Sequence, residues 1–171
     1  MPDYAFAIKP QMRQSAPCGA PWRAGPGEKA MYNKILVAID LADPAPTPKG
    51  LAEATELASA SSGVLRLVNI QPLLPATFME YVPADFDAEQ EKRATSALQD
   101  IVAAVQLPKE RVSGVVRVGG IYHEILGEAA EWGADLIVVG SHRPVVADYL
   151  LGSNAKTIVR HALCSVLVVR P

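Results

Sequence analysis

Apolar residues follow two different periods from residue 32 to the end of the chain. Five short runs rich in valine, isoleucine and leucine predict β-strands, at residues 34–40, 64–70, 112–118, 135–140 and 165–169. The segments between these runs repeat apolar residues at helical spacing, so we expect four helices there. The clearest apolar stripe consists of Ala94, Leu98, Ile101, Val102 and Val105.

Proline and glycine mark the expected ends of the helices. Thr47 followed by Pro48 is typical of a helix start, because a threonine can cap the helix and proline suits its first position. Gly63 and Gly133 follow the first and third apolar stripes, and a glycine often ends a helix. Pro108 is expected to stop the second helix.

Strands that alternate with helices predict a mostly parallel sheet, because each connection must cross over the sheet. Residues 136–139 are apolar without alternation, as in a strand that helices cover on both faces. Gly114 and Arg117 favour an edge position for the strand at 112–118. The pattern therefore predicts one α/β domain over residues 32–171, a doubly wound three-layer sandwich.

Residues 1–31 differ from the rest of the chain. They contain several prolines and glycines and almost no apolar periodicity, which predicts a disordered extension. Met31 directly precedes the first strand, so a second interpretation is that translation begins there. A transit peptide is the weaker alternative, because Asp3 and Glu28 do not fit one.

The composition limits the classes of binding partner and the cellular compartment that we expect. The 171 residues carry a formal net charge of −2, which gives no electrostatic case for nucleic acid or an anionic membrane as partner. No apolar run approaches the roughly 20 residues that span a bilayer, and the first 30 residues lack a secretory signal. Cys18 and Cys164 are too few for a disulfide framework. We expect a cytoplasmic protein.

The segment 140–154 has the parts of an anion site at the end of the fourth strand, where ligands of parallel sheets bind. Gly140 and Gly152 let the backbone approach a ligand closely. Ser153 or Asn154 can cap the next helix, whose first amides would then face the anion. An ordinary glycine turn with a helix cap fits the same residues, and composition leaves the two interpretations even.

Three other features near the strand ends carry candidate chemistry. His142 and Arg143 add hydrogen-bond donors to the loop after the fourth strand. Asp40 ends the first strand and is placed to accept from a ribose hydroxyl, although Asp40 could instead form a turn. Gly119 begins a tight strand-to-helix turn. Neither a dinucleotide G-x-G-x-x-G motif nor a phosphate-binding P-loop occurs.

The sequence gives little indication of a catalytic site or a metal site. His123, His142 and His161 fall on separate elements without cysteine or carboxylate partners at ligand spacing. Ser141 and His142 are adjacent and cannot form a nucleophile–base pair, and no G-x-S-x-G elbow exists. We assign no catalytic residue and no metal ligand.

Several segments together resemble the universal stress proteins, most closely the bacterial F/G type. They are Gly-Ser-His-Arg-Pro at 140–144, Tyr-Leu-Leu-Gly-Ser-Asn-Ala at 149–155, Ser-Val-Leu-Val-Val-Arg at 165–170 and Lys-Ile-Leu-Val-Ala-Ile-Asp at 34–40. The resemblance extends over residues 32–170. It implies a five-stranded parallel sheet of order 3-2-1-4-5, the adenine nucleotide alpha hydrolase-like fold, and a homodimer through the last strand at 166–169.

The resemblance also implies an adenine nucleotide as ligand: ATP, with ADP and AMP as alternatives and Mg²⁺ accompanying ATP. It places Asp40 near the nucleoside, the backbone of Val68 and the neighbouring Gly119 at adenine, and the 140–154 segment at the ribose and phosphates. The implied nucleotide-binding residues are Ala38, Ile39, Asp40, Val68, Gly119, Val139, Gly140, His142, Arg143, Gly152, Ser153 and Asn154.

The chain departs from the family's G-x2-G-x9-G-[STN] pattern in two ways. Arg143 replaces the second glycine, and the loop is one residue shorter. The predicted function is an ATP-binding universal stress protein that acts in stress response or signalling as a dimer. The alternatives are a structural dimer that binds no nucleotide and a slow ATPase. An adenylating enzyme is disfavoured, because residues 41–44 lack a serine- and glycine-rich phosphate loop.

Overall fold

The computed structural model describes residues 31–42, 47–73, 86–141 and 152–170. The predicted disordered extension over residues 1–31 lies outside the described residues, apart from Met31. None of the described helices combines the length and the apolar character needed to cross a bilayer.

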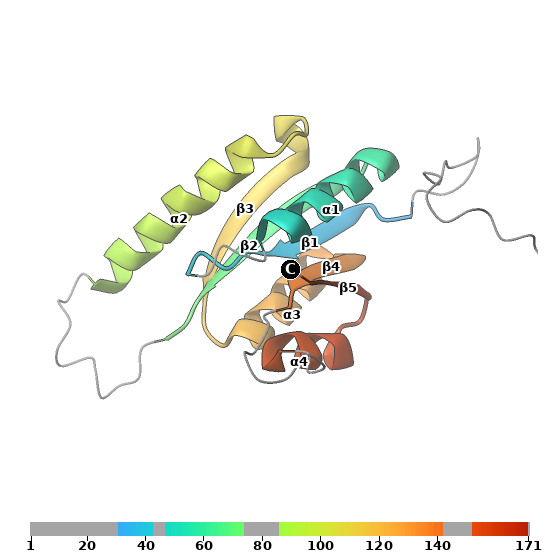
Figure 1. Cartoon of the computed structure of the whole chain (residues 1–171). Coiled ribbons are helices and arrows are strands. Elements are labelled where there is room, and N and C mark those ends of the chain that lie inside the picture. Colours follow the sequence, from blue (N-terminus) through green and yellow to red (C-terminus); the bar gives the residue numbers. More distant parts are fainter. Residues whose placement is uncertain (1–30, 43–46, 74–85, 142–151, 171) are drawn as a thin grey trace, which may run out of the picture.

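The described strands form one parallel sheet, as the alternating pattern predicts. They are β1 (Lys34–Ala38), β2 (Val64–Gln71), β3 (Val112–Val118), β4 (Leu136–Gly140) and β5 (Ser165–Val169). All four pairings are parallel, and the order is β3-β2-β1-β4-β5 (Figure 1). The predicted order and the edge position of β3 are therefore confirmed.

Helices cover both faces of the sheet. They are α1 (Thr47–Ser61), α2 (Phe86–Ala104), α3 (Ile121–Trp132) and α4 (Ser153–His161). Apolar residues of α1 and α2 join one core cluster, and those of α3 and α4 join a second cluster on the other face. Strands β1 and β4 contribute to both clusters, which explains their unbroken apolar sequences.

The first strand is shorter than predicted. It ends at Ala38 rather than Asp40. The N–H of Ile39 still donates to the carbonyl of Val68, at 2.8 Å. One residue later, Oδ1 of Asp40 accepts from the N–H of Ala42 at 2.9 Å, and this short-range bond turns the chain out of the sheet. The turn places Asp40 beyond the carboxyl end of β1.

A network of salt bridges joins α3 to the sheet. Glu128 of α3 is 4% exposed and accepts from Arg66 of β2 at 2.8 Å and from Arg117 of β3 at 2.5 Å. Arg117 also binds Glu131, at 2.8 Å, and Glu124, at 3.1 Å.

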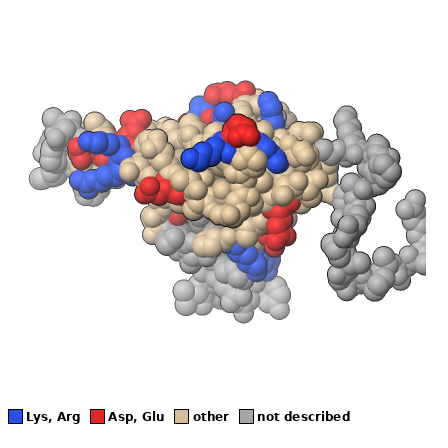
Figure 2. Space-filling view, turned by 90° about the horizontal axis from the view of Figure 1, so that it is seen from above, with Lys and Arg blue, Asp and Glu red and all other residues tan. Residues whose placement is uncertain are grey.

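On the face seen in Figure 2, acidic and basic side chains are interspersed among uncharged residues, so charge of one sign does not gather there.

Candidate functional site

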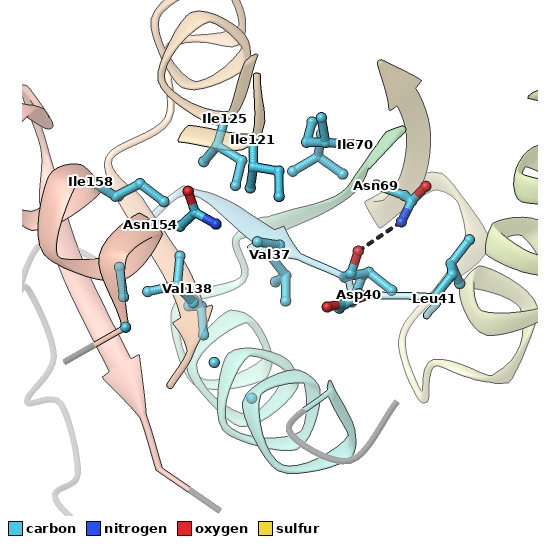
Figure 3. Close-up of a pocket in the computed structure, with 18 of the residues that line it drawn as sticks. Val37, Asp40, Leu41, Asn69, Ile70, Ile121, Ile125, Val138, Asn154 and Ile158 are labelled. Atoms are coloured by element: carbon cyan, nitrogen blue, oxygen red, sulfur yellow. Dashed lines mark hydrogen bonds between the residues drawn. The ribbon is translucent and has the colours of Figure 1, made fainter. Parts of the chain in front are cut away.

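A pocket of about 430 Å³ opens at the carboxyl ends of β1 and β4. It lies between the amino ends of α1, α3 and α4, where the winding of the sheet reverses. Apolar side chains form most of one wall, and polar groups stand at its ends (Figure 3). Few polar groups on an apolar wall are typical of small-molecule sites.

Most of the predicted site residues meet in this pocket. They are Ala38, Ile39, Asp40, Val68, Val139, Gly140, Gly152, Ser153 and Asn154. Gly119 is not among the lining residues. His142 and Arg143 lie outside the described residues, so their predicted contacts stay predictions.

The amino end of α4 faces the pocket with its backbone. Neither Ser153 nor Asn154 caps this helix, contrary to the prediction: Gly152 occupies the cap position, and both residues lie inside the helix. The first helical bond runs from the N–H of Lys156 to the carbonyl of Gly152, at 2.9 Å. The amides of Ser153, Asn154 and Ala155 precede that bond and form the positive end of the helix dipole.

Gly152 leaves room in front of these amides. A Cβ atom at this position would meet no atom of the described residues within 4 Å. Its φ of −52° and ψ of 149° suit any residue, so backbone strain does not require glycine here. Packing against the described residues therefore does not require glycine at position 152.

Asp40 serves the turn and lines the pocket at the same time. Its Oδ1 accepts from the N–H of Ala42, as the turn interpretation predicts. A carboxylate has about four acceptor sites, so a role in the turn does not by itself preclude contact with a ligand. The two interpretations of Asp40 are therefore compatible.

Val68 and Ile70 approach the pocket from β2. The side chain of Val68 is fully buried, and its carbonyl accepts from Ile39. Successive peptides of a parallel strand turn toward opposite neighbours, so the peptide that next faces β1 is that of Ile70. The pairing of β1 with β2 ends at Ala38 and Val68, and Ile70 therefore faces the space beyond β1.

Sequence reasoning missed several lining residues. The apolar wall is supplied by Ile70 of β2, Ile121 and Ile125 of α3, and Ile158 of α4 (Figure 3). Asn69 and Gln71 supply polar groups at the end of β2. The available signal was the pair of carboxamides two positions apart on one strand, because such residues share a face.

Gly119 shapes the turn into α3 rather than the pocket wall. Its φ is +152°, and a Cβ atom there would lie 2.8 Å from Oε1 of Glu124. Its N–H donates to the carbonyl of Gln71, at 3.0 Å. These contacts bring the start of α3 over the sheet, where Ile121 reaches the pocket.

The titratable groups with shifted pKa values lie outside the pocket. Hydrogen bonding and charge attraction from Arg117 lower the pKa of Glu131, and the same pairing raises the pKa of Arg117. Burial raises the pKa of the Cys164 thiol, with a smaller contribution from Asp135. Among the described residues, no cluster of histidine, cysteine and carboxylate could hold a metal ion.

Sequence comparisons identify the family of the chain. The model of the universal stress protein family matches residues 31–170. Universal stress protein G of Shigella flexneri is 33% identical over 143 residues, which cover 82% of this chain and 100% of the relative. Universal stress protein A homolog 1 of Coxiella burnetii is 34% identical over 145 residues, which cover 81% of this chain and 96% of the relative.

Solved structures share the fold. A universal stress protein family member from Burkholderia pseudomallei is 28% identical, with a TM-score of 0.60, covering 82% of this chain and 97% of that chain. UspA from Lactobacillus plantarum is 23% identical, with a TM-score of 0.66, covering 81% of this chain and 98% of that chain. The chain belongs to the universal stress protein family.

Proposed function

We propose that the pocket binds an adenine nucleotide, with ATP as the main ligand and ADP or AMP as alternatives. The observation that carries this proposal is the meeting of Asp40, Gly140 and the open amino end of α4 around one pocket of about 430 Å³. A nucleotide needs a hydroxyl acceptor, an anion site and an apolar surface together. This pocket offers all three.

Each part of the nucleotide has a suitable counterpart. The amides of Ser153 and Asn154 favour a phosphate, because a helix amino end attracts negative charge. Asp40 accepts from the ribose hydroxyls. The base lies against the apolar wall, with the peptide of Ile70 in reach of its edge. Mg²⁺ accompanies ATP and is held by the phosphates rather than by a protein cage.

One relative supports the ligand class. A universal stress protein solved in complex with cAMP shares this fold, with a TM-score of 0.61 and 23% identity. Cyclic AMP carries the same base and ribose as ATP. We further propose that the chain acts in stress response or signalling in the cytoplasm, with weak ATP hydrolysis at most.

Nucleotide carried through purification tests the proposal. The full chain is denatured after rapid purification, and the supernatant is separated by anion-exchange chromatography. Adenine nucleotide near one per chain is the expected result. Added ATP should also raise the melting temperature, because a ligand at 100 times its Kd stabilises by about 2.7 kcal/mol. Absence of both effects would exclude the pocket as a nucleotide site.

Asp40→Asn is expected to weaken ATP binding about fivefold. The amide oxygen can keep the contact with Ala42, but the ribose loses a charged acceptor, a difference of about 1 kcal/mol. Calorimetric titration gives the Kd values. Asp87→Asn, an exposed change at the start of α2, is the matched control. Equal Kd values for Asp40→Asn and Asp87→Asn would show that Asp40 does not contact the nucleotide.

The proposed partner is a second copy of the chain, paired along β5. This strand lies at the sheet edge, and the neighbouring Leu163 is 98% exposed. Ser165 donates its N–H toward β4 and Val169 accepts from Ser141, so the peptides of Val166 and Val168 turn outward. An unpaired apolar edge favours pairing with another copy.

Light scattering at micromolar concentration tests this dimer. The wild-type chain is expected to have twice its monomer mass of 18.2 kDa. Val168→Pro should shift it toward monomer, because proline removes an outward N–H without removing a bond to β4. A wild-type monomer would refute the dimer, and a dimeric Val168→Pro would place its interface elsewhere.

A further inference from the structure

Two carboxamides form a short hydrogen-bonded chain at the end of β2. Asn69 is 3% exposed, and its Nδ2 donates to the carbonyl of Ile39 at 2.9 Å, the dashed line in Figure 3. Its Oδ1 accepts from Nε2 of Gln71 at 2.5 Å. Both residues line the pocket. The chain therefore runs from a backbone carbonyl, through a buried side chain, to a pocket residue.

The direction of this chain is fixed by its buried end. A backbone carbonyl can only accept, so Asn69 must present its nitrogen to Ile39 and its oxygen to Gln71. Gln71 must in turn present its nitrogen to Asn69. Reversing Gln71 would set its oxygen against Oδ1 of Asn69, and reversing both would set Oδ1 against the carbonyl of Ile39. Each reversal leaves buried acceptors unpaired.

The fixed orientation leaves Oε1 of Gln71 for a ligand. None of the described residues donates to this oxygen. No buried side-chain oxygen of the described residues lacks a partner, so Oε1 is open to solvent. Nε2 also carries a second N–H, in addition to the one that Asn69 accepts. Gln71 thus offers an acceptor next to a donor, in an order that Asn69 and Ile39 determine.

We propose that Gln71, oriented by Asn69, selects adenine over purines that carry an oxygen at C6. This inference rests on the proposed nucleotide site. Adenine pairs a 6-amino donor with a neighbouring ring-nitrogen acceptor, which matches a carboxamide in two places. Guanine and hypoxanthine present an oxygen at C6, which would face Oε1. Accommodating them would require the reversal that Asn69 opposes.

Calorimetric titration of the full chain with ATP and with inosine triphosphate tests the proposal. The wild-type chain is expected to bind ATP about tenfold more tightly, the discrimination typical of a two-point contact to a base. In Gln71→Met, of similar length but without the amide, the two Kd values should become equal. Gln99→Met, an exposed change on α2, should keep the wild-type ratio.

The outcomes separate this inference from the nucleotide site itself. Equal wild-type affinities, or a tenfold ratio that persists in Gln71→Met, would overturn the role of Gln71 while leaving nucleotide binding intact. Failure of the wild-type chain to bind either nucleotide would instead overturn the proposed function. If Gln71→Met does not fold, Gln71→Ala gives the same readout. Asn69→Leu should also lower the ratio, because Gln71 is then free to reverse.

Discussion

Gly152→Val is expected to abolish ATP binding and to leave the fold intact. The new side chain meets no atom of the described residues within 4 Å of its Cβ, and the backbone conformation suits valine. It would occupy the space in front of the α4 amides where we place the phosphates. Without a contact between the phosphates and these amides, calorimetry should detect no saturable binding of ATP.

The melting temperature of the same variant shows whether the effect is local. It should match that of the wild-type chain without ligand, and ATP should no longer raise it. Gly127→Ala is the control, because a Cβ atom there also meets no described atom within 4 Å, but Gly127 lies on α3 outside the pocket lining. If Gly152→Val bound ATP normally, the phosphates could not lie at the amino end of α4 as proposed.

Glu128→Gln is expected to cause the largest loss of stability. The change removes the charge that Arg66 and Arg117 share and leaves two partly buried guanidinium groups without it. Breaking a fully buried pair costs about 3–5 kcal/mol. Both arginine side chains are partly exposed, at 30% and 23%, so we expect about 2 kcal/mol from urea unfolding.

Glu131→Gln is the matched control for Glu128. Glu131 binds the same arginine, but its side chain is 66% exposed. Water competes for such a pair, so the change should cost under about 1 kcal/mol. Equal losses in the two variants would show that burial of Glu128 does not set the strength of the network.

The sequence predicted the fold well because its signals are local and redundant. Each strand is a short run rich in apolar residues, and each helix carries its own apolar stripe. Gly133 ends α3 with a φ of 74°, as a glycine after a helix predicts. Alternation of strands with helices then left only crossover connections. The order β3-β2-β1-β4-β5 came from the family resemblance rather than from the pattern.

The candidate site was only partly predictable. Gly140 and Gly152 were predicted because a glycine at the end of a strand or just before a helix is a visible signal. The predicted cap of α4 was wrong. Ser153 and Asn154 both have side chains that can cap a helix, and only the backbone torsions show that α4 begins at Ser153. The spacing of Asn69 and Gln71 puts them on one face of β2, but the bond from Asn69 to Ile39 depends on how β1 and β2 pair, which the pattern of one strand does not contain.

A calorimetric titration of the nucleotide-free full chain with ATP tests the nucleotide site most directly. We expect a saturable isotherm with one site per chain, lost in Gly152→Val and retained in Gly127→Ala. A titration of the wild-type chain without saturable heat at any temperature tried, together with an unchanged melting temperature, would contradict the proposed nucleotide site.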